Sequence, residues 1–414
     1  MERVDQQLGE YRLLARLAEG GQSKVFLAAR GGPHGFFRPV VIKALPEDFK
    51  GDRRLEALFY QEATISSRFA HPNVVTIHDA KRANGEHFMV MDYVAGQTVA
   101  DLAQRAFSQG PGLALEETLA IGIGACRGLD YVHDFQDVDC RDYSIVHCDI
   151  SPQNLMVTYN GVTRVFDFGI SQVVGESGVD KTDLVGGKFT YMSPEQCLEE
   201  PLDIRSDIFS LGIILYELAA GTRLFRRGDH NAVVEAITSE PIAPPSTHNS
   251  ELDEQFDRVV LKALERQPED RYATAGQFQR QLSALLEGLG ADIDEVREGL
   301  GRKVADLFEQ ERQTVASTLH NARQRMSEQA FTPVNPDNDD DDPSERELEL
   351  EEQLEEAEQR IDELRTSAER ATEVASALTE EVTELRERQN WFVAGMCVLS
   401  LVALAVAALA HLAQ

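Results

Sequence analysis

The chain opens with short apolar runs and continues with longer stretches whose apolar residues recur at helical spacing. Short runs rich in β-branched and aromatic residues predict β-strands. Four such strands are predicted early in the chain: Val25–Ala29, Val40–Ala44, Val74–Ala80 and Phe88–Met91. The Asn84-Gly85 dipeptide between the last two predicts a tight hairpin turn, because this pair readily adopts positive φ angles.

Helical spacing is clearest in three segments: Leu55–Phe69, Ile208–Ala220 and Leu252–Glu265. Strands that give way to helices in this order predict an α+β domain at residues 11–285. A polar helical extension is predicted at residues 286–330. Its apolar positions, such as Val304, Leu307, Phe308 and Val315, would let it pack on that domain.

Residues 331–343 interrupt this pattern. Pro333, Pro336 and Pro343 cannot continue a helix, and the aspartates from Asp339 to Asp342 repel one another. We therefore expect an extended acidic linker at 331–343.

A heptad pattern follows at residues 344–389. Ser344 and Glu347 form a possible capping box at its start. Its apolar residues alternate in steps of four and three: Leu350, Leu354, Ala357, Ile361, Leu364, Ala368, Ala371, Ala375, Leu378, Val382 and Leu385. Such a seam predicts a coiled coil and hence a homodimer, although the alanine-rich middle leaves the number of strands open. The alternative is a single amphipathic helix on the surface of the preceding domain.

The last apolar run predicts a transmembrane helix at 391–413. Trp391–Ala410 contains neither charge nor proline, and its length spans the ~30 Å core of a bilayer. Arg386 and Arg388 on the N-terminal flank predict that the preceding chain faces the cytoplasm. A buried helix of a soluble domain is the alternative, and only four residues follow Ala410 to cover it. We expect a single-pass tail anchor in the inner membrane, with the lipid bilayer as a partner.

Charge and cysteine content narrow the function classes. The 414 residues carry a formal net charge of −31, which argues against nucleic acid as a partner. Residues 331–389 alone hold 21 acidic and 6 basic residues, a net of −15.

The N-terminus lacks a secretory signal pattern, and the cysteines show no metal-type spacing, so we expect free thiols in a reducing cytosol. The five cysteines are Cys126, Cys140, Cys148, Cys197 and Cys397.

A glycine-containing segment near the N-terminus is a candidate phosphate cradle, because glycine lets the backbone approach phosphate closely. By itself this signal is weak, since paired glycines more often mark an ordinary turn. The candidate residues are Leu17, Ala18, Glu19, Gly20, Gly21, Gln22, Ser23 and Val25. Further along, Lys43 ends an apolar strand, and Glu62 lies on a predicted helix from which it could pair with that lysine.

The strongest chemical signal lies in the middle of the chain. His147-Cys148-Asp149-Ile150-Ser151-Pro152-Gln153-Asn154 is followed by Val165-Phe166-Asp167-Phe168-Gly169. Asp149 can accept a hydrogen bond from an attacking hydroxyl group, and Asn154 and Asp167 can bind Mg²⁺. Phosphoryl transfer from ATP needs these groups, together with a cradle and a cation for the phosphates.

With these motifs, residues from about Tyr11 to Leu285 resemble the bacterial eukaryotic-like (Hanks-type) serine/threonine protein kinases. The resemblance also rests on His71-Pro72-Asn73, Phe88–Val94, Tyr191-Met192-Ser193-Pro194-Glu195, Arg205–Gly212 and Pro268–Tyr272. It implies a two-lobed fold with ATP and Mg²⁺ between the lobes, and protein substrates. Further roles follow from it for Met91 as gatekeeper, Asp92 and Val94 as adenine contacts, Asp207 as a structural aspartate, and Glu195 with Arg271 as an ion pair.

The chain departs from this family pattern at several positions. Ala18 and Ser23 replace loop glycines, and we expect this to change nucleotide affinity without abolishing binding. Cys148 replaces an arginine that in relatives pairs with a phosphorylated activation loop. We therefore expect activity to be independent of such pairing, and an inert Cys148 thiol rather than a redox sensor. Mutation of Ser177 and Thr182 tests this expectation.

Two further departures affect the acceptor. Ser151 replaces a lysine that helps to neutralise the transferring phosphoryl group, and Lys188 and Phe189 replace a Thr-Pro-type pair that helps to recognise serine or threonine. Acceptor type is therefore less firmly predicted than the kinase class. We expect an active serine/threonine kinase, with a membrane-anchored pseudokinase scaffold as the alternative. A purely structural membrane protein would leave most of the chain without a role.

Overall fold

The computed structural model describes residues 2–20, 23–32, 35–45, 52–136, 145–168 and 188–330. The predicted linker (331–343), coiled coil (344–389) and transmembrane helix (391–413) lie outside these residues and stay predictions. Within the described ranges, no helix is long and apolar enough to cross a membrane.

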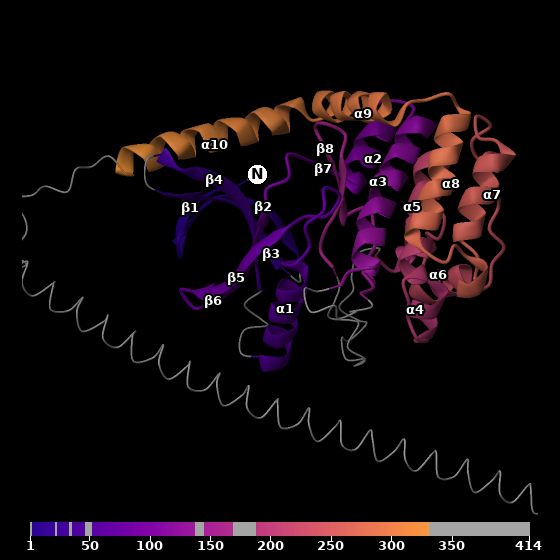
Figure 1. Ribbon diagram of the computed structural model, residues 1–414, viewed down its shortest axis with the longest axis horizontal. Helices are drawn as coiled ribbons and strands as arrows, with labels where there is room; N and C mark the ends of the chain where they lie inside the picture. The colour runs from indigo at the N-terminus through magenta and orange to yellow at the C-terminus, as the bar shows by residue number, and fades with distance from the viewer. Residues whose placement is uncertain are drawn as a thin grey trace, which may run out of the picture. The chain divides into compact units, whose positions relative to one another are not determined.

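A six-stranded antiparallel sheet forms the N-terminal lobe (Figure 1). Its strand order is β1-β2-β3-β4-β6-β5. The strands are β1 (Glu2–Leu8), β2 (Tyr11–Gly20), β3 (Ser23–Gly31), β4 (Phe37–Ala44), β5 (Ile77–Ala83) and β6 (Glu86–Asp92). The predicted hairpin turn between β5 and β6 is confirmed, because Asn84 and Gly85 have φ angles of 53° and 80°.

Three of the four predicted strands lie within β3, β4 and β6. The fourth prediction was wrong at its start: β5 begins at Ile77, whereas Val74 forms an isolated parallel bridge with Val165 of the other lobe. Strand β1 was not predicted, because its sequence is polar and only Leu8 is buried. Its pairing with β2, rather than a hydrophobic pattern, defines it.

Helix α1 (Arg53–Ser66) packs against β5 and carries the predicted helical segment that contains Glu62. It begins after Asp52, whose carboxylate accepts hydrogen bonds from the backbone N–H groups of Arg54 and Leu55. Phe59 and Ala63 bury its inner face in a cluster with residues of β5 and β6. This packing fixes the position of Glu62 relative to the sheet.

The C-terminal lobe is helical and surrounds α5, in which every residue from Ser206 to Ala220 is buried. The predicted helices here are confirmed with shifted ends. The α-helices are α2 (Val99–Gln109), α3 (Leu115–His133), α4 (Pro194–Leu198), α5 (Arg205–Ala220), α6 (His230–Thr238), α7 (Glu254–Ala263) and α8 (Ala275–Gly288). Shorter elements are β7 (Gly96–Thr98), β8 (Leu155–Thr158), β9 (Thr163–Val165), η5 (Lys188–Tyr191), η6 (Pro245–Thr247) and η7 (Pro268–Asp270).

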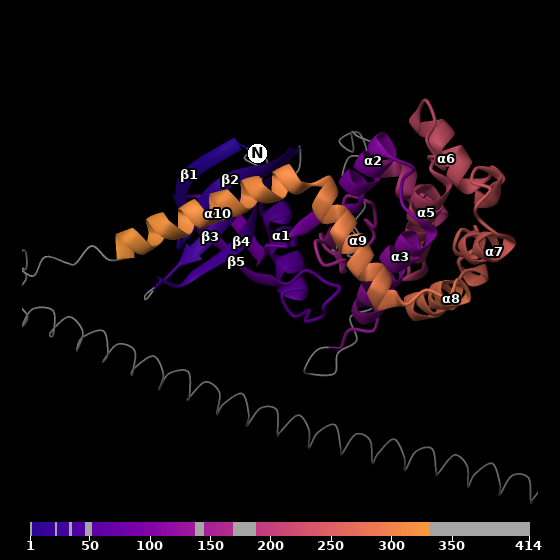
Figure 2. The same ribbon diagram turned by 90° about the horizontal axis from the view of Figure 1, so that it is seen from above.

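The predicted helical extension consists of α9 (Ile293–Leu307) and α10 (Glu309–Ala330). Its predicted boundary at residue 286 falls inside α8, so the extension begins only after the turn that follows Gly288. Helix α9 lies along α3 of the C-terminal lobe, whereas α10 lies over the sheet of the N-terminal lobe (Figure 2). The extension therefore contacts both lobes.

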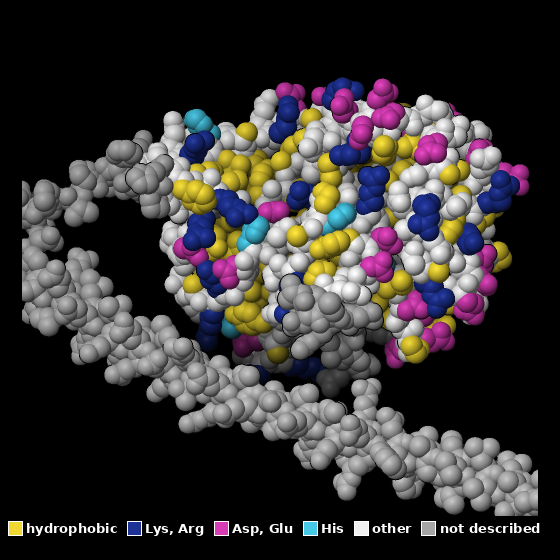
Figure 3. Space-filling view, in the orientation of Figure 1, with side chains coloured by type: hydrophobic (Ala, Val, Ile, Leu, Met, Phe, Trp, Pro, Cys, Tyr) yellow, Lys and Arg dark blue, Asp and Glu magenta, His cyan; other side chains and the backbone are white. Residues whose placement is uncertain are grey.

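Each of the two helices has its own anchor. In α9, Gly301 lies so close to the β8–β9 turn that an added Cβ would be 2.7 Å from the backbone nitrogen of Gly161. In α10, Ala322 is buried against β2 and β3, and hydrophobic side chains gather below this helix in Figure 3. Where the helices meet, Arg105 of α2 donates to the carbonyl of Leu307 (2.8 Å) and to the carboxylate of Glu311 (2.6 Å).

Candidate active site

The predicted phosphate cradle is the hairpin formed by β2 and β3. Its paired residues are Ala18 with Val25, Glu19 with Lys24, and Gly20 with Ser23. Gly21 and Gln22, at the tip of the hairpin, lie outside the described residues. Leu17 is exposed at the start of this segment. Because Val25 is also paired with Lys43 on β4, the hairpin lies directly beside the predicted lysine.

Lys43 lies where the two lobes meet. Its ammonium contacts Oδ1 of Asp167 from the C-terminal lobe, and lies 3.8 Å from Oε1 of Glu62 on α1. The predicted Lys43–Glu62 pair is thereby confirmed as a contact. One cation thus joins β4, α1 and the segment after β9.

Burial and the neighbouring opposite charge shift the pKa values of Lys43 and Glu62 in opposite directions. Burial lowers the pKa of Lys43, but the carboxylates of Asp167 and Glu62 outweigh it, so the pKa lies above its ordinary value and the ammonium stays charged. Burial raises the pKa of Glu62 to about 7, against the attraction of Lys43. The nearby acidic groups Asp167 and Asp149 contribute to this rise. Lys43 is consequently a permanent cation that faces several competing carboxylates.

The predicted adenine contacts lie at the end of β6. Asp92 is its last residue, and its backbone N–H already donates to the carbonyl of Thr76 at 3.0 Å. A nucleotide contact at Asp92 therefore has to use the backbone carbonyl. Met91, the predicted gatekeeper, is paired with Val41 inside the sheet, and Val94 follows as a buried residue.

Asp149 and Asn154 lie together in the loop before β8. The side-chain amide of Asn154 donates to both Oδ2 and the backbone carbonyl of Asp149, each at 2.8 Å. These bonds orient the carboxylate and leave the amide oxygen of Asn154 as its possible metal ligand. The structure therefore brings Asp149 and Asn154 together, and their roles as proton acceptor and metal ligand stay predictions.

The oxygen groups of Asn154 and Asp167 fit Mg²⁺, which is held by one or two protein ligands together with substrate phosphates. Within the described part of the chain, no group of three or more His, Cys, Asp or Glu side chains could hold a metal ion.

Phe168, next to Asp167, is buried between the lobes. Its ring lies 5.1 Å from that of Phe69 beyond α1 and 4.6 Å from that of His147. His147 in turn contacts the carbonyl of Phe166 through Nε2 at 3.1 Å. These contacts hold the backbone on both sides of Asp167, whose φ of 62° is unusual for a residue other than glycine. The predicted Gly169 lies outside the described residues.

Asp207 at the start of α5 fixes the backbone of the predicted catalytic loop, which we define as His147–Asn154. Its carboxylate accepts hydrogen bonds from the backbone N–H groups of His147 (2.8 Å) and Cys148 (2.9 Å). Nε2 of His133 also lies 2.8 Å from Oδ2 of Asp207, and both side chains are 1% exposed. Sequence reasoning missed His133, because a lone histidine at the end of a helix carries no distinctive signal.

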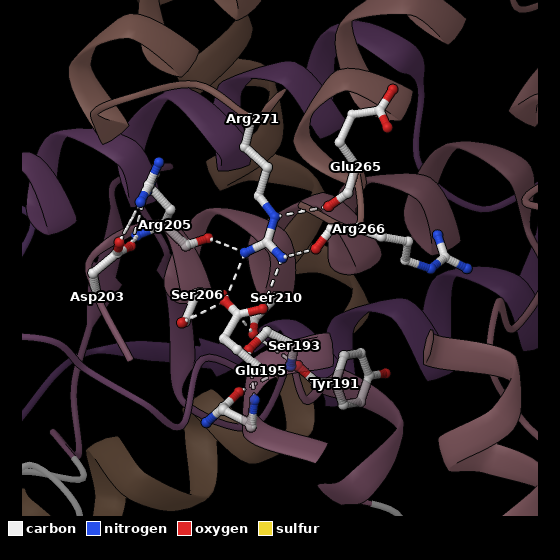
Figure 4. Close-up of polar contacts among 11 residues, drawn as sticks. Tyr191, Ser193, Glu195, Asp203, Arg205, Ser206, Ser210, Glu265, Arg266 and Arg271 are labelled. Carbon is white, nitrogen blue, oxygen red and sulfur yellow. Dashed lines mark hydrogen bonds and ion pairs between the residues drawn. The ribbon is translucent and has the colours of Figure 1, made fainter. Parts of the chain in front are cut away.

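Glu195 and Arg271 form the predicted ion pair through two parallel contacts of 2.7 and 2.8 Å (Figure 4). Arg271 also donates to three backbone carbonyls, and Ser206 donates to Glu195 at 2.6 Å. Burial raises the pKa of Glu195, but the bonds from Arg271 and Ser206 outweigh it and lower the pKa. The carbonyl acceptors belong to Arg205, Glu265 and Arg266.

The departures from the family pattern lie in different surroundings. Cys148 is buried, and burial raises the pKa of its thiol, as do the nearby Asp207 and Asp149. The hydroxyl group of Ser151 is buried and has no hydrogen-bond partner among the described residues. Phe189 on η5 packs edge-on against His230, with ring centroids 4.6 Å apart. The thiol is thus protonated and shielded, in agreement with an inert Cys148.

Comparison with known proteins agrees with this geometry. The family model described as "Protein kinase domain" matches residues 11–282. The chain is 37% identical over 290 residues to the "Tyrosine-protein kinase MasK" of Myxococcus xanthus, which covers 69% of this chain and 45% of that protein. It is 34% identical to the "Serine/threonine-protein kinase PknB" of Mycolicibacterium smegmatis, over 69% of this chain and 44% of that protein.

Among solved structures, a crystal structure of the PknI kinase domain from Mycobacterium tuberculosis has a TM-score of 0.52 and 23% sequence identity. It covers 69% of this chain and 98% of that domain, and shows the fold alone. The chain spans less than half the length of the curated relatives named above.

Proposed function

The chain belongs to the protein kinase family, and on that premise we propose that it transfers the γ-phosphate of ATP to hydroxyl groups of proteins. One observation carries the proposal most directly. Lys43 contacts both Glu62 and Asp167, while Asp149 and Asn154 are hydrogen-bonded to each other in the loop before β8. These five residues are the ones whose loss usually leaves a kinase fold without activity.

Each residue has a role in this proposal. Lys43 holds the α- and β-phosphates, and Glu62 orients its ammonium. Asn154 and Asp167 would hold Mg²⁺, which would neutralise charge on the phosphates. Asp149 accepts a hydrogen bond from the attacking hydroxyl group and orients it toward the phosphate.

We propose serine and threonine as the acceptors, supported by the serine/threonine kinases among the relatives. Ser151 brings no charge to the transferring phosphoryl group, and the 37% identical relative is described as a tyrosine kinase. Phosphotyrosine is therefore the competing outcome. A pseudokinase scaffold is the weaker alternative, because Lys43, Asp149 and Asp167 are all present.

The test uses the purified protein with labelled ATP and Mg²⁺, beside an Asp149→Asn variant. The proposal expects label in the wild type only, and phosphoserine or phosphothreonine after acid hydrolysis. Equal label in both proteins would overturn the enzymatic proposal. Phosphotyrosine as the sole product would overturn the acceptor proposal and leave the kinase activity standing.

We also propose that residues 344–389 pair two chains and that residues 391–413 anchor them in the inner membrane, with the kinase domain in the cytoplasm. Support comes from the heptad seam and the uncharged run described above. Pairing would raise the local concentration of kinase domains and favour phosphorylation in trans.

A protein ending at Gln389 that stays monomeric by light scattering at high concentration contradicts the pairing. Recovery of the full chain in the soluble fraction contradicts the anchor.

A further inference from the structure

Gln196, the third residue of α4, contacts the catalytic loop 48 residues earlier in the sequence. Its Nε2 donates to the backbone carbonyl of Cys148 at 2.7 Å. At the same time its Oε1 accepts from the backbone N–H of Ser193 at 2.9 Å. The two contacts need a donor on one side and an acceptor on the other, and the amide of Gln196 supplies both.

The bonded carbonyl belongs to the peptide group that joins Cys148 to Asp149. The N–H of that same peptide group points to Nδ1 of His147, 3.3 Å away. Gln196 and His147 therefore hold this peptide plane from its two ends. The plane leads directly to Asp149, the proposed proton acceptor.

The preceding peptide plane is held independently, because Asp207 accepts the N–H of Cys148 at 2.9 Å. Between these two planes Cys148 has a φ of 63°, a left-handed conformation that is unfavourable for a residue with a Cβ. Such a conformation persists only where the surrounding contacts overdetermine it. Asp207 and Gln196 supply those contacts, one on each side of the Cys148 Cα.

We propose that Gln196 is a positioning residue for the catalytic loop: it holds the Cys148–Asp149 peptide and thereby the direction of the Asp149 carboxylate. It connects that loop to α4, which is fixed by the neighbouring Glu195–Arg271 pair. In relatives with arginine at position 148, a phosphorylated activation loop makes a link to this loop. In this chain the backbone carbonyl of Cys148 links the catalytic loop to α4 through Gln196, without any phosphate. The inference rests on the proposed phosphoryl transfer.

Substitutions at two positions separate the loop contact from the helix cap. Gln196→Glu keeps an acceptor for Ser193, and a glutamate suits this position of a capping box, but it loses the donor to Cys148. Gln196→Met loses both contacts. Ser193→Ala removes the hydroxyl that accepts the N–H of Gln196 and leaves the contact with Cys148 in place.

The experiment measures kcat, KM for ATP and the melting temperature of the full chain and its three variants. Both Gln196 variants are expected to lower kcat about tenfold, with KM for ATP within about twofold, because a backbone acceptor beside Asp149 loses its partner. The melting temperature should fall in all three variants, since each of them loses at least one hydrogen bond. Wild-type kcat in both Gln196 variants would overturn the inference, as would an equal loss of kcat in Ser193→Ala.

Hydrogen exchange at the Asp149 amide supplies a readout that does not depend on transfer. Faster exchange is expected in Gln196→Met than in Ser193→Ala, since only the first releases the Cys148–Asp149 peptide. Equal exchange in these two variants would overturn the inference. A wild-type protein without transfer activity would instead overturn the proposed function, and the exchange comparison would still decide whether Gln196 holds the loop.

Discussion

The two lobes hold their halves of the site in different ways. In the C-terminal lobe, Arg271 and Glu195 are 0% and 3% exposed, and Asp207 is bonded to two backbone N–H groups. In the N-terminal lobe, Lys43 and Glu62 are 17% and 13% exposed and lie 3.8 Å apart. The C-terminal half is thus held by short hydrogen bonds between buried groups, whereas Lys43 and Glu62 in the N-terminal half attract each other as charges over a longer distance.

This difference follows from where each group is attached. Asp207 lies on the buried helix α5, and Glu195 and Arg271 are hydrogen-bonded to Ser206 and Arg205 at the start of that helix. Lys43 and Glu62 are on β4 and α1, and their charge partner Asp167 belongs to the other lobe. We therefore expect changes in the C-terminal half to affect folding or chemistry strongly, and changes in the N-terminal half to respond to pH and ligands.

Asp149→Asn should have the largest effect, a loss of about 10³-fold in transfer rate, because an amide is a poor acceptor for the attacking hydroxyl proton. Initial rates with labelled ATP measure it. Asp134→Asn, an exposed carboxylate at the end of α3, is the matched control and should stay within about twofold of wild type. A loss of less than tenfold in Asp149→Asn would contradict the role of Asp149.

Arg271→Ala should lower the free energy of unfolding by about 3–5 kcal/mol, because it leaves the Glu195 carboxylate buried and unpaired. Urea unfolding of the two proteins measures the change. The exposed pair Arg258–Glu254 has side chains 63% and 85% exposed, so Arg258→Ala should cost less than about 1 kcal/mol. Similar losses of unfolding free energy in both variants would contradict the expected difference between buried and exposed ion pairs.

Glu62 should make stability depend on pH in the nucleotide-free protein. Its pKa is raised in the folded state from the ordinary 4.5 to about 7, so the folded protein binds the proton more tightly than the unfolded chain. Stability of the wild type relative to Glu62→Gln is therefore highest below about pH 4.5 and falls as pH rises to about 7, by on the order of 2 kcal/mol. Unfolding of both proteins across this range measures the difference, and a constant difference would show that Glu62 is not perturbed.

The smallest effect is expected at Cys148. Because burial raises the pKa of its thiol, iodoacetamide at pH 8 should label the more exposed Cys197 well before Cys148, as peptide mass spectrometry can show. Cys148→Ser should change the transfer rate by less than about threefold. Rapid labelling of Cys148 with loss of activity would point to a reactive thiol instead.

Much of the candidate site could be predicted from the sequence, because its chemically active residues lie in short sequence motifs. Asp149, Asn154 and Asp167 are the residue types that the reaction needs, at a spacing that a single loop and strand pair can bring together. The Asn84-Gly85 turn was likewise predictable, since its two positive φ angles depend on local backbone preferences. These features depend on near neighbours in the chain.

Other features were decided only by the tertiary structure. Strand β1 has a polar sequence and exists through its pairing with β2, and Val74 joins the other lobe rather than β5. The pKa of Glu62 depends on burial by distant elements, and α9 and α10 divide their contacts between the two lobes. Gln196 looks in the sequence like an ordinary helix cap, and only the fold places its amide on the carbonyl of Cys148.

The sequence by itself thus predicted the reaction class, through residue types whose chemistry does not depend on their neighbours in space. The tertiary structure decided how these residues are held, because the strength of a hydrogen bond or ion pair depends on the burial and alignment of both partners. Lys43 and Asp149 could be named from the chain alone. Their support by Glu62, Asp207 and Gln196 depends on packing between segments far apart in the sequence.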